Sequence, residues 1–517
     1  MDSAQDPTPS AVTGNGSFRF SSEIIMHILR FLGPTDILSM RKTCRMMHRV
    51  TKYRVVWLEA LERVCEKYGI FKPTFPTEKM SILELEHAST GPTRFLAGVK
   101  MYEPDECVRP YITRTPQFRW ERRSYDFYGY DTFHLVPGGR FLFTCNSHVV
   151  CLFDLGYSMN VHVKSTPLAI LKGFGELKAV APTTNGKELL IATTKGRVRS
   201  STAQVNSAEL AGRTAAGAPS SKILYIHQID PNHRSEDLKF CCKGKMELHY
   251  GPEAYTFTGN IHLTSTFAFF KRNEEFVYWN WEGNTGCRWP ASGMLHSTQF
   301  HAFQDTAMLC RTNGQLPRAA GPTTRPGGPN ERAEGTLPTP DGGDGVDMCA
   351  PSVWCENSTL DPHLCLIYLT RDTSYLHLYS IKPLPGPGSP FLPRSLPVPG
   401  GHTTKFYGDN HPSSSFYQLL PYLFRCDDEL VICTTSNERG LLMSILPVPS
   451  KATQEEITPT TFALVPAGSL MEDIERNQFA FCPMSGRVVY FGSSGESDDV
   501  RVADYLLPPE EPLQEPS

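Results

Sequence analysis

The spacing of apolar residues changes once along this 517-residue chain, and this change limits the folds that the chain can adopt. Between Phe20 and Tyr68, apolar residues recur three and four positions apart, which predicts amphipathic helices. Beyond residue 90, segments of five to seven residues rich in Val, Ile, Phe and Tyr alternate with Gly, Pro and Asn turns, which predicts strands. We therefore expect an α plus mainly β multidomain protein, in which a small helical domain precedes a large all-β domain.

Three helices are predicted in the first segment, and each carries an apolar stripe. The stripes consist of Ile24, Ile25, Ile28, Leu29 and Leu32 in the first helix, of Ile37, Met40, Cys44 and Met47 in the second, and of Trp57, Leu58, Leu61, Val64, Cys65 and Tyr68 in the third. Gly33 and Pro34 separate the first two helices. Stripes this apolar are unfavourable in water, so we expect a partner to cover part of them.

The same segment resembles the F-box family over about forty residues. The matching residues are Glu23-Ile24, Ile28-Leu29, Leu32, Pro34, Asp36-Ile37-Leu38, Thr43-Cys44-Arg45, Val50 and Trp57. The chain departs from the family at the start, where Phe20-Ser21 stands in place of the usual Leu-Pro. The alternative is an ordinary three-helix subdomain without a partner, but helical spacing alone would not produce the Pro34, Asp36, Cys44 and Trp57 pattern.

The β segment contains a recurring unit whose first copy runs from His134 to Leu155 and resembles a blade of a WD-repeat propeller. Strand endings of the same kind recur at Asp154, Asp230, Asn280, Ser380, Ser444 and Asp504. Their spacing is roughly 50 to 65 residues once two low-complexity inserts are left out. We expect a β-propeller of six to eight blades, in which residues 95–130 supply a strand or blade that closes the ring. A pair of β-sandwiches or an irregular β-solenoid is the alternative.

These patterns divide the chain into five parts. They are a disordered tail at 1–17, the F-box helical domain at 18–70, a linker at 71–94, the propeller-like domain at 95–507 and a disordered tail at 508–517. Two segments of the β domain, at about 199–221 and 311–347, are rich in small residues, Gly and Pro. We expect them to be mobile inserts, because they cannot bury enough apolar surface to offset the entropy of ordering.

Charge and motifs exclude several functions. A net charge of −4 excludes a nucleic-acid-binding protein that is basic throughout. No stretch of the sequence reaches the about 18 consecutive apolar residues that a membrane-spanning helix needs. The 15 cysteines include no Cys-x-x-Cys pair, so we expect reduced thiols in an intracellular protein, cytoplasmic or nuclear. Phosphate loops, nucleophile elbows and zinc helices are absent from the sequence.

Two aromatic or basic clusters could bind a peptide. One contains Tyr278, Trp279, Trp281 and Trp289, for which packing between blades is the favoured interpretation. The other consists of Arg114, Arg119, Arg122 and Arg123 around Trp120 and Tyr125. It could contact an acidic peptide, although a solvated surface is the simpler interpretation.

The F-box resemblance implies the substrate-recognition subunit of a Skp–cullin–F-box ubiquitin ligase, without catalytic residue or cofactor. The implied contacts to the Skp-type adaptor are Phe20, Glu23, Ile24, Ile28, Leu29, Leu32, Pro34, Asp36 and Leu38, and Cys44 and Trp57 are expected in the F-box core. A cullin would bind through the adaptor, and the β domain would hold an unknown protein substrate. The alternatives are an interaction scaffold outside any ligase and an enzyme built on a propeller.

Overall fold

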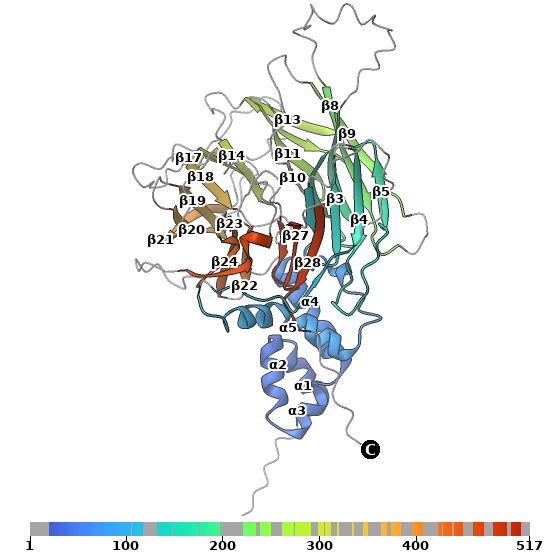
Figure 1. The fold of residues 1–517 in the computed structure, drawn as a ribbon, viewed down its shortest axis with the longest axis vertical. Helices are drawn as coiled ribbons and strands as arrows, with labels where there is room; N and C mark the ends of the chain where they lie inside the picture. The colour runs from blue at the N-terminus through green and yellow to red at the C-terminus, as the bar shows by residue number, and fades with distance from the viewer. Residues whose placement is uncertain are drawn as a thin grey trace, which may run out of the picture.

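The structure is a computed structural model in which helices occupy one end and the sheets fan out beyond them (Figure 1). It describes residues 20–104, 106–116, 132–146, 148–174, 176–196, 221–233, 238–249, 261–272, 275–290, 298–303, 306–311, 318–319, 333–334, 345–349, 363–369, 374–383, 395–406, 422–426, 428–436, 439–447, 459–469, 479–493 and 498–507. The predicted tails at 1–17 and 508–517 lie outside these residues. No helix among them is long and apolar enough to cross a membrane.

The helical end differs from the prediction in the number of its helices. They are α1 (Ser22–Leu29), α2 (Pro34–Arg41), α3 (Arg45–Val50), α4 (Arg54–Tyr68), the 3-10 helix η1 (Lys72–Thr74) and α5 (Ile82–Val99). The prediction of one continuous second helix is wrong, because that segment forms two helices, α2 and α3. Its break lies at Cys44, whose extended backbone (φ −159°, ψ 166°) forms the N-cap of α3.

The segment 71–94 is not the predicted linker, since most of it belongs to the 18-residue helix α5. A capping box starts this helix. The Ser81 backbone N–H donates to Glu84 Oε2 at 2.7 Å, and the Glu84 N–H donates to Ser81 Oγ at 3.2 Å. The structured helical region therefore extends to Val99, beyond the predicted end at residue 70.

The β domain contains six four-stranded antiparallel sheets. Five take their strands in sequence order: β2 (Thr132–Leu135), β3 (Phe141–Cys145), β4 (Val149–Asp154) and β5 (Ala169–Lys172); β6 (Glu176–Pro182), β7 (Leu189–Gly196), β8 (Ser221–Ile229) and β9 (Cys241–His249); β10 (Ile261–Leu263), β11 (Phe267–Arg272), β12 (Glu275–Asn280) and β13 (Thr285–Pro290); β18 (Gly345–Cys349), β19 (His363–Leu369), β20 (Ser374–Pro383) and β21 (Ser395–Phe406); β22 (Tyr422–Cys426), β23 (Glu429–Ser436), β24 (Gly440–Pro447) and β25 (Thr460–Val465), followed by the 3-10 helix η4 (Ala467–Ser469). The sixth contains β26 (Phe479–Cys482), β27 (Arg487–Ser493), β28 (Asp498–Asp504) and β1 (Ile112–Arg114).

Two hairpins stand between the third and fourth of these sheets along the chain. They pair β14 (Thr298–Phe303) with β15 (Thr306–Arg311), and β16 (Arg318–Ala319) with β17 (Ala333–Glu334). β15 also contacts β16, so the hairpins take the place of a seventh blade. The second hairpin lies in the insert predicted to be mobile at 311–347, which therefore contains regular structure. β15 ends at residue 311 and β18 begins at residue 345, and the other residues of that insert, like nearly all of 199–221, lie outside the described residues.

The sheets are arranged as the blades of a propeller. First strands of neighbouring blades contact one another, as β6 does β10, β14 does β18 and β26 does β2. Apolar clusters fill the spaces between blades, and one of them joins the second blade to the third around Trp279 and Trp281. That cluster confirms the packing interpretation for these tryptophans. The predicted propeller is confirmed, whereas a sandwich would not place first strands side by side.

The six predicted strand endings all fall on the third strand of a blade, in β4, β8, β12, β20, β24 and β28 or directly after it. The ring closes through β1, whose Ile112 pairs with Asp504 and whose Arg114 pairs with Val502. This confirms that residues 95–130 supply a closing strand. Arg114, whose side chain is 15% exposed, therefore has a structural role, and the other members of its predicted basic cluster lie outside the described residues.

Candidate adaptor-binding surface

Helix α1 presents two neighbouring apolar rows, one inward and one outward. Ser21 caps the helix, since its hydroxyl accepts a hydrogen bond from the Ile24 N–H at 3.4 Å. Ile25 and Leu29 are each 1% exposed and belong to the core. The outward row contains Phe20, Ile24, Ile28 and Phe31, which are 41%, 49%, 39% and 78% exposed. We call these four residues the α1 stripe.

The structure separates the predicted adaptor contacts into surface and core residues. Phe20, Glu23, Ile24, Ile28 and Asp36 are exposed; Leu32, Pro34 and Leu38 are half-buried. The prediction of Leu29 as an adaptor contact is wrong, because a side chain already buried within the chain offers no surface to a partner. Phe31 was missed by the sequence reasoning. Its position three residues after Ile28 would have placed it beside the predicted stripe.

The two residues assigned to the F-box core have opposite outcomes. Trp57 is fully buried, and its indole Nε1–H donates to the Thr51 carbonyl oxygen at 2.8 Å. Cys44 is exposed, so its assignment to the core is wrong. A hydrogen bond from the Met47 backbone N–H lowers the pKa of the Cys44 thiol, because it stabilises the thiolate.

Helix α5 joins the F-box helices as their continuation. The Arg41 guanidinium of α2 lies 5.4 Å from the Trp57 ring and forms a two-pronged ion pair with Glu86 of α5, at 3.0 and 2.7 Å. The Ser89 hydroxyl of α5, which donates to the Leu85 carbonyl oxygen at 2.7 Å, lies 3.5 Å from the Trp57 carbonyl oxygen. Forked pairs of this kind fix relative orientation as well as distance, so α2, α4 and α5 form one unit.

The helical unit is in turn fixed to the propeller. The Phe71 N–H donates to the Pro137 carbonyl oxygen at 3.1 Å, and Arg140 of the first blade donates to the carbonyl oxygen of Pro73 at 3.3 Å. On the other side, the Phe95 ring of α5 packs against Phe481 of the last blade, with centroids 5.6 Å apart. One continuous apolar core includes residues of α1 to α5 and of these blades.

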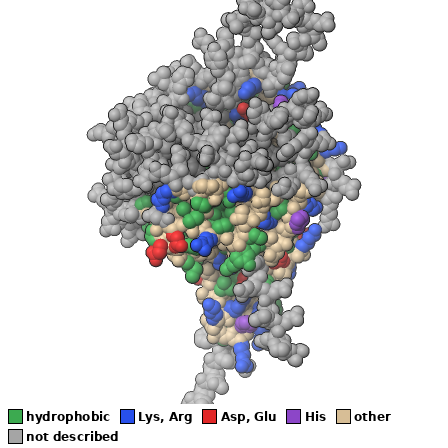
Figure 2. Space-filling model, viewed as in Figure 1, with side chains coloured by type: hydrophobic (Ala, Val, Ile, Leu, Met, Phe, Trp, Pro, Cys, Tyr) green, Lys and Arg blue, Asp and Glu red, His purple; other side chains and the backbone are tan. Residues whose placement is uncertain are grey.

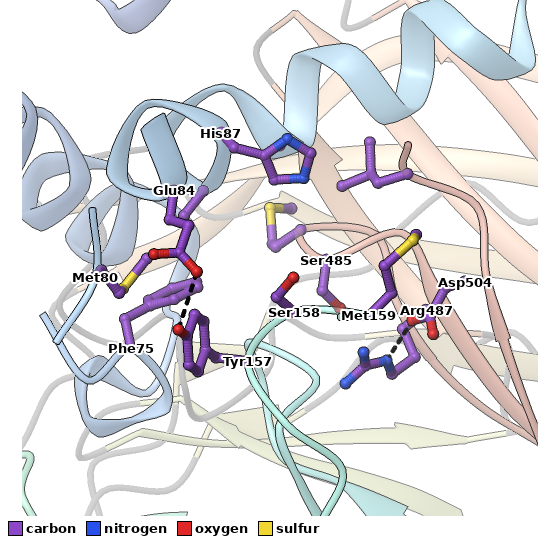
Figure 3. A pocket seen from close by; sticks show the side chains of 14 residues that line it. Phe75, Met80, Glu84, His87, Tyr157, Ser158, Met159, Ser485, Arg487 and Asp504 are labelled. Atoms are coloured by element: carbon purple, nitrogen blue, oxygen red, sulfur yellow. Dashed lines mark hydrogen bonds and ion pairs between the residues drawn. The ribbon is translucent and has the colours of Figure 1, made fainter. Parts of the chain in front are cut away.

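A crevice marks the junction of α5 with the first and last blades (Figure 3). Across it, the Tyr157 hydroxyl donates to Glu84 Oε1 at 3.0 Å. His87 lines the same crevice, and burial together with the nearby Arg94 lowers the pKa of its imidazole to about 4. The crevice has a volume of about 50 Å³, which is room for a few water molecules rather than a cofactor.

The contacts with the helices identify the face of the propeller that they cover. Pro137 and Met484 belong to loops that join first to second strands, and Tyr157 to a loop that joins a third to a fourth strand. In antiparallel blades, both kinds of loop lie at one face, and loops joining second to third strands lie at the other. The helices therefore occupy one face, and the opposite face is on the far side from them (Figure 1).

The second blade presents a basic group at that opposite face. Glu176 begins β6 and forms an ion pair with Lys178 at 2.9 Å, while Lys222 lies 3.9 Å away. Burial raises the pKa of the Glu176 carboxyl, but hydrogen bonding and charge from Lys178 lower this pKa by more than burial raises it. The net shift of the pKa is therefore downward. Lys195 lies over the Phe174 ring, 5.3 Å from its centroid. Lys178 and Lys222 thus flank the Glu176 carboxylate, and Lys195 belongs to the neighbouring strand β7.

Comparison with known proteins identifies the helical end. Residues 18–59 match the F-box domain family. No curated relative matches the chain. Among solved structures, the chain is similar to the WD40 domain of coronin from Toxoplasma gondii, with a TM-score of 0.41 and 10% identity over 80% of this chain and 91% of that chain. It is also similar to U3-55K, with a TM-score of 0.38 and 9% identity over 77% of this chain and 99% of that one.

Proposed function

We propose that this chain, an F-box protein with an F-box domain at residues 18–59 and a carboxyl-terminal β-propeller, is the substrate-recognition subunit of a Skp–cullin–F-box ubiquitin ligase. An F-box domain implies a Skp-type adaptor as partner, and a propeller next to it points to a non-enzymatic interaction protein. We further propose that the chain acts in a ligase, that a cullin binds through the adaptor, and that the propeller binds a protein substrate.

The α1 stripe is the observation that carries the proposal. Phe20, Ile24, Ile28 and Phe31 are exposed on α1 and just beyond its two ends, whereas the other apolar row of the helix is fully buried. Burying one such side chain contributes roughly 1.5–3 kcal/mol, so a partner that covers the four would gain substantial binding free energy. The sequence resemblance assigns that partner as the Skp-type adaptor.

The junction supports the second half of the proposal. Fixed contacts from α5 to the F-box helices and to the propeller would hold a substrate on the opposite face at a constant distance and orientation from the adaptor. In this mechanism, the chain would contribute proximity, since a bound substrate lysine meets the ubiquitin-charged enzyme at high effective concentration. No catalytic group of this chain is required.

The cellular location follows as part of the proposal. The eleven cysteines whose side chains the structure describes are free thiols, which favours a reducing compartment, the cytoplasm or the nucleus.

The test is affinity purification of the full chain from cells, with adaptor and cullin quantified by mass spectrometry. Ile24→Asp and Ile28→Asp place a charge on the stripe and are expected to remove the adaptor while the propeller stays folded. Ile170→Asp is the matched control, because Ile170 is 41% exposed on the outer strand β5. Undiminished adaptor with both stripe variants would refute the docking surface, and adaptor without cullin would favour a scaffold outside any ligase.

A further inference from the structure

The F-box segment carries charge of the opposite sign to the rest of the chain. Residues 18–59 contain eight lysine and arginine residues and three acidic residues, a formal charge of +5 in a chain whose total is −4. A net positive charge therefore resides in a segment that is less than a tenth of the sequence. Space-filling Figure 2 shows Lys, Arg and His side chains on the narrow end of the molecule, where Figure 1 places α1 to α3.

Several of these cations hold the fold together. Arg30 pairs with Glu59 at 2.8 Å, and Arg41 pairs with Glu86 at 2.7 Å. Arg54 donates to the carbonyl oxygens of Met80 and Thr77. The fold thus explains why these positions are basic.

Four other cations have no such role. Lys42, Arg45, Arg49 and Lys52 are all exposed, and none forms an ion pair with any residue that the structure describes. Arg45 and Arg49 lie four residues apart on α3, and Lys52 follows three residues later. We call these four residues the α3 basic surface.

Within the α3 basic surface, Arg45 is unfavourably placed for the helix that carries it. Arg45 is the first residue of α3, where the positive end of the helix dipole disfavours a cation. Arg49 four residues later adds repulsion between like charges on one helix face. A local rule broken without a compensating contact in the fold is typical of a functional surface.

We propose that the α3 basic surface attracts an acidic surface of the Skp-type adaptor and steers it onto the α1 stripe, an inference that rests on the proposed function. The α1 stripe supplies apolar area but no long-range force. The field of the α3 basic surface reaches about 8 Å at physiological salt and about 30 Å at 0.01 M. Helices α1 and α3 contact each other, so the field and the apolar stripe belong to one small module. Charges beside an apolar contact raise the association rate more than they slow dissociation.

The test measures association and dissociation of purified adaptor and full-length chain by stopped-flow fluorescence at 20, 150 and 500 mM NaCl. The variant is Lys42→Glu/Arg45→Glu/Arg49→Glu/Lys52→Glu. The control, Lys187→Glu/Lys239→Glu/Lys243→Glu/Lys245→Glu, makes the same change in net charge at exposed lysines of the second blade. Melting temperatures establish that both variants are folded.

At 20 mM NaCl we expect the α3 variant to associate at least ten-fold more slowly than wild type, with dissociation changed less than two-fold. The wild-type association rate should fall with salt, and the rate of the variant should not. Equal association rates for the α3 variant and the control would overturn the inference, as would a loss confined to dissociation. RNA retained by wild type and lost by the variant, with adaptor association unchanged, would reassign the surface to nucleic acid. Failure of wild type to bind adaptor at any salt would instead overturn the proposed function and this inference together.

Discussion

Arg114 on β1 and Asp504 at the end of β28 form an ion pair, with 2.7 Å between Nη2 and Oδ2, although 390 residues separate them. The other carboxylate oxygen of Asp504 accepts a hydrogen bond from Arg487 Nε at 2.6 Å. Arg487 also donates to the Gly156 carbonyl oxygen of the first blade at 2.9 Å. One buried carboxylate therefore joins the strand that closes the ring to the last blade, and through Arg487 to the first.

Asp504→Asn is expected to destabilise the propeller by about 3–5 kcal/mol, because it leaves two arginine side chains without their buried counter-charge. The side chains of Asp504 and Arg487 are each 4% exposed, so water cannot replace the lost partner. The measurement is urea unfolding followed by tryptophan fluorescence. Asp428→Asn, at an exposed aspartate, is the matched control and should change stability by less than about 0.5 kcal/mol. Equal stability of the two variants would contradict the role given to Asp504.

Strand endings were the part of the propeller most accessible from the sequence. All six predicted endings fall on third strands or directly after them, and such a strand can keep an unbroken buried apolar run before its polar ending, as β4 does before Asp154. The hairpins β14–β15 and β16–β17 gave no such ending. Their strands are not joined into one four-stranded sheet, so no ending of the repeat arises there.

Gly91→Ala and Gly98→Ala are expected to have opposite effects, although both change glycine to alanine in α5. A Cβ at Gly91 would lie 2.8 Å from the Met484 carbonyl oxygen of the last blade, whereas a Cβ at Gly98 meets nothing within 4 Å. Gly91→Ala should cost about 1–3 kcal/mol through forced separation of helix and blade. Gly98→Ala should stabilise by about 0.5–1 kcal/mol, since alanine is the better helix former.

Thermal unfolding of the two glycine variants is the measurement, and limited proteolysis between α5 and β1 reports the junction directly. Faster cleavage of Gly91→Ala than of wild type would follow from a loosened junction. A Gly91→Ala variant as stable as Gly98→Ala would mean that α5 does not lie this close to the last blade.

Helix α5 and the orientation of α1 show where sequence reasoning stopped. The signal for α5 was present as Ser81 and Glu84 three residues apart, although segment 71–94 was predicted to be a linker. For α1, the spacing identified the adjacent rows Ile24/Ile28 and Ile25/Leu29 without deciding which faces inward. That choice depends on how α1 packs on the other F-box helices, which no local pattern contains. The sequence therefore predicted which helix contacts the adaptor, but not which face of that helix does so.

Ser81→Ala is expected to destabilise the helical unit by about 0.5–2 kcal/mol, because it removes the side-chain oxygen that accepts from the Glu84 N–H. The loss should appear in urea unfolding as a lower midpoint. Ser81→Asp keeps an acceptor at the cap position and should restore most of the stability. No difference between Ser81→Ala and Ser81→Asp would mean that the capping box does not hold the start of α5.

Acid should destabilise the propeller through buried histidines. His227 is 3% exposed, and burial lowers the pKa of its imidazole to about 4 from an ordinary 6.5. Between these values the unfolded chain binds a proton that the folded chain does not, so stability falls as pH drops from about 6.5 towards 4. One such histidine contributes at most about 1.4 kcal/mol per pH unit.

His227→Phe is expected to flatten this dependence while leaving the fold intact at pH 7, because the imidazole packs among the aromatic rings of Phe174 and Tyr225. The measurement is the urea midpoint at pH 7, 6 and 5. Exposed His162→Phe is the control and should keep the wild-type slope. His87 and His134 have pKa values lowered to about 4 by burial as well, so part of the slope should remain in His227→Phe. A slope identical to that of wild type would show that His227 does not contribute to the pH dependence of stability, and that water reaches its ring in the folded chain.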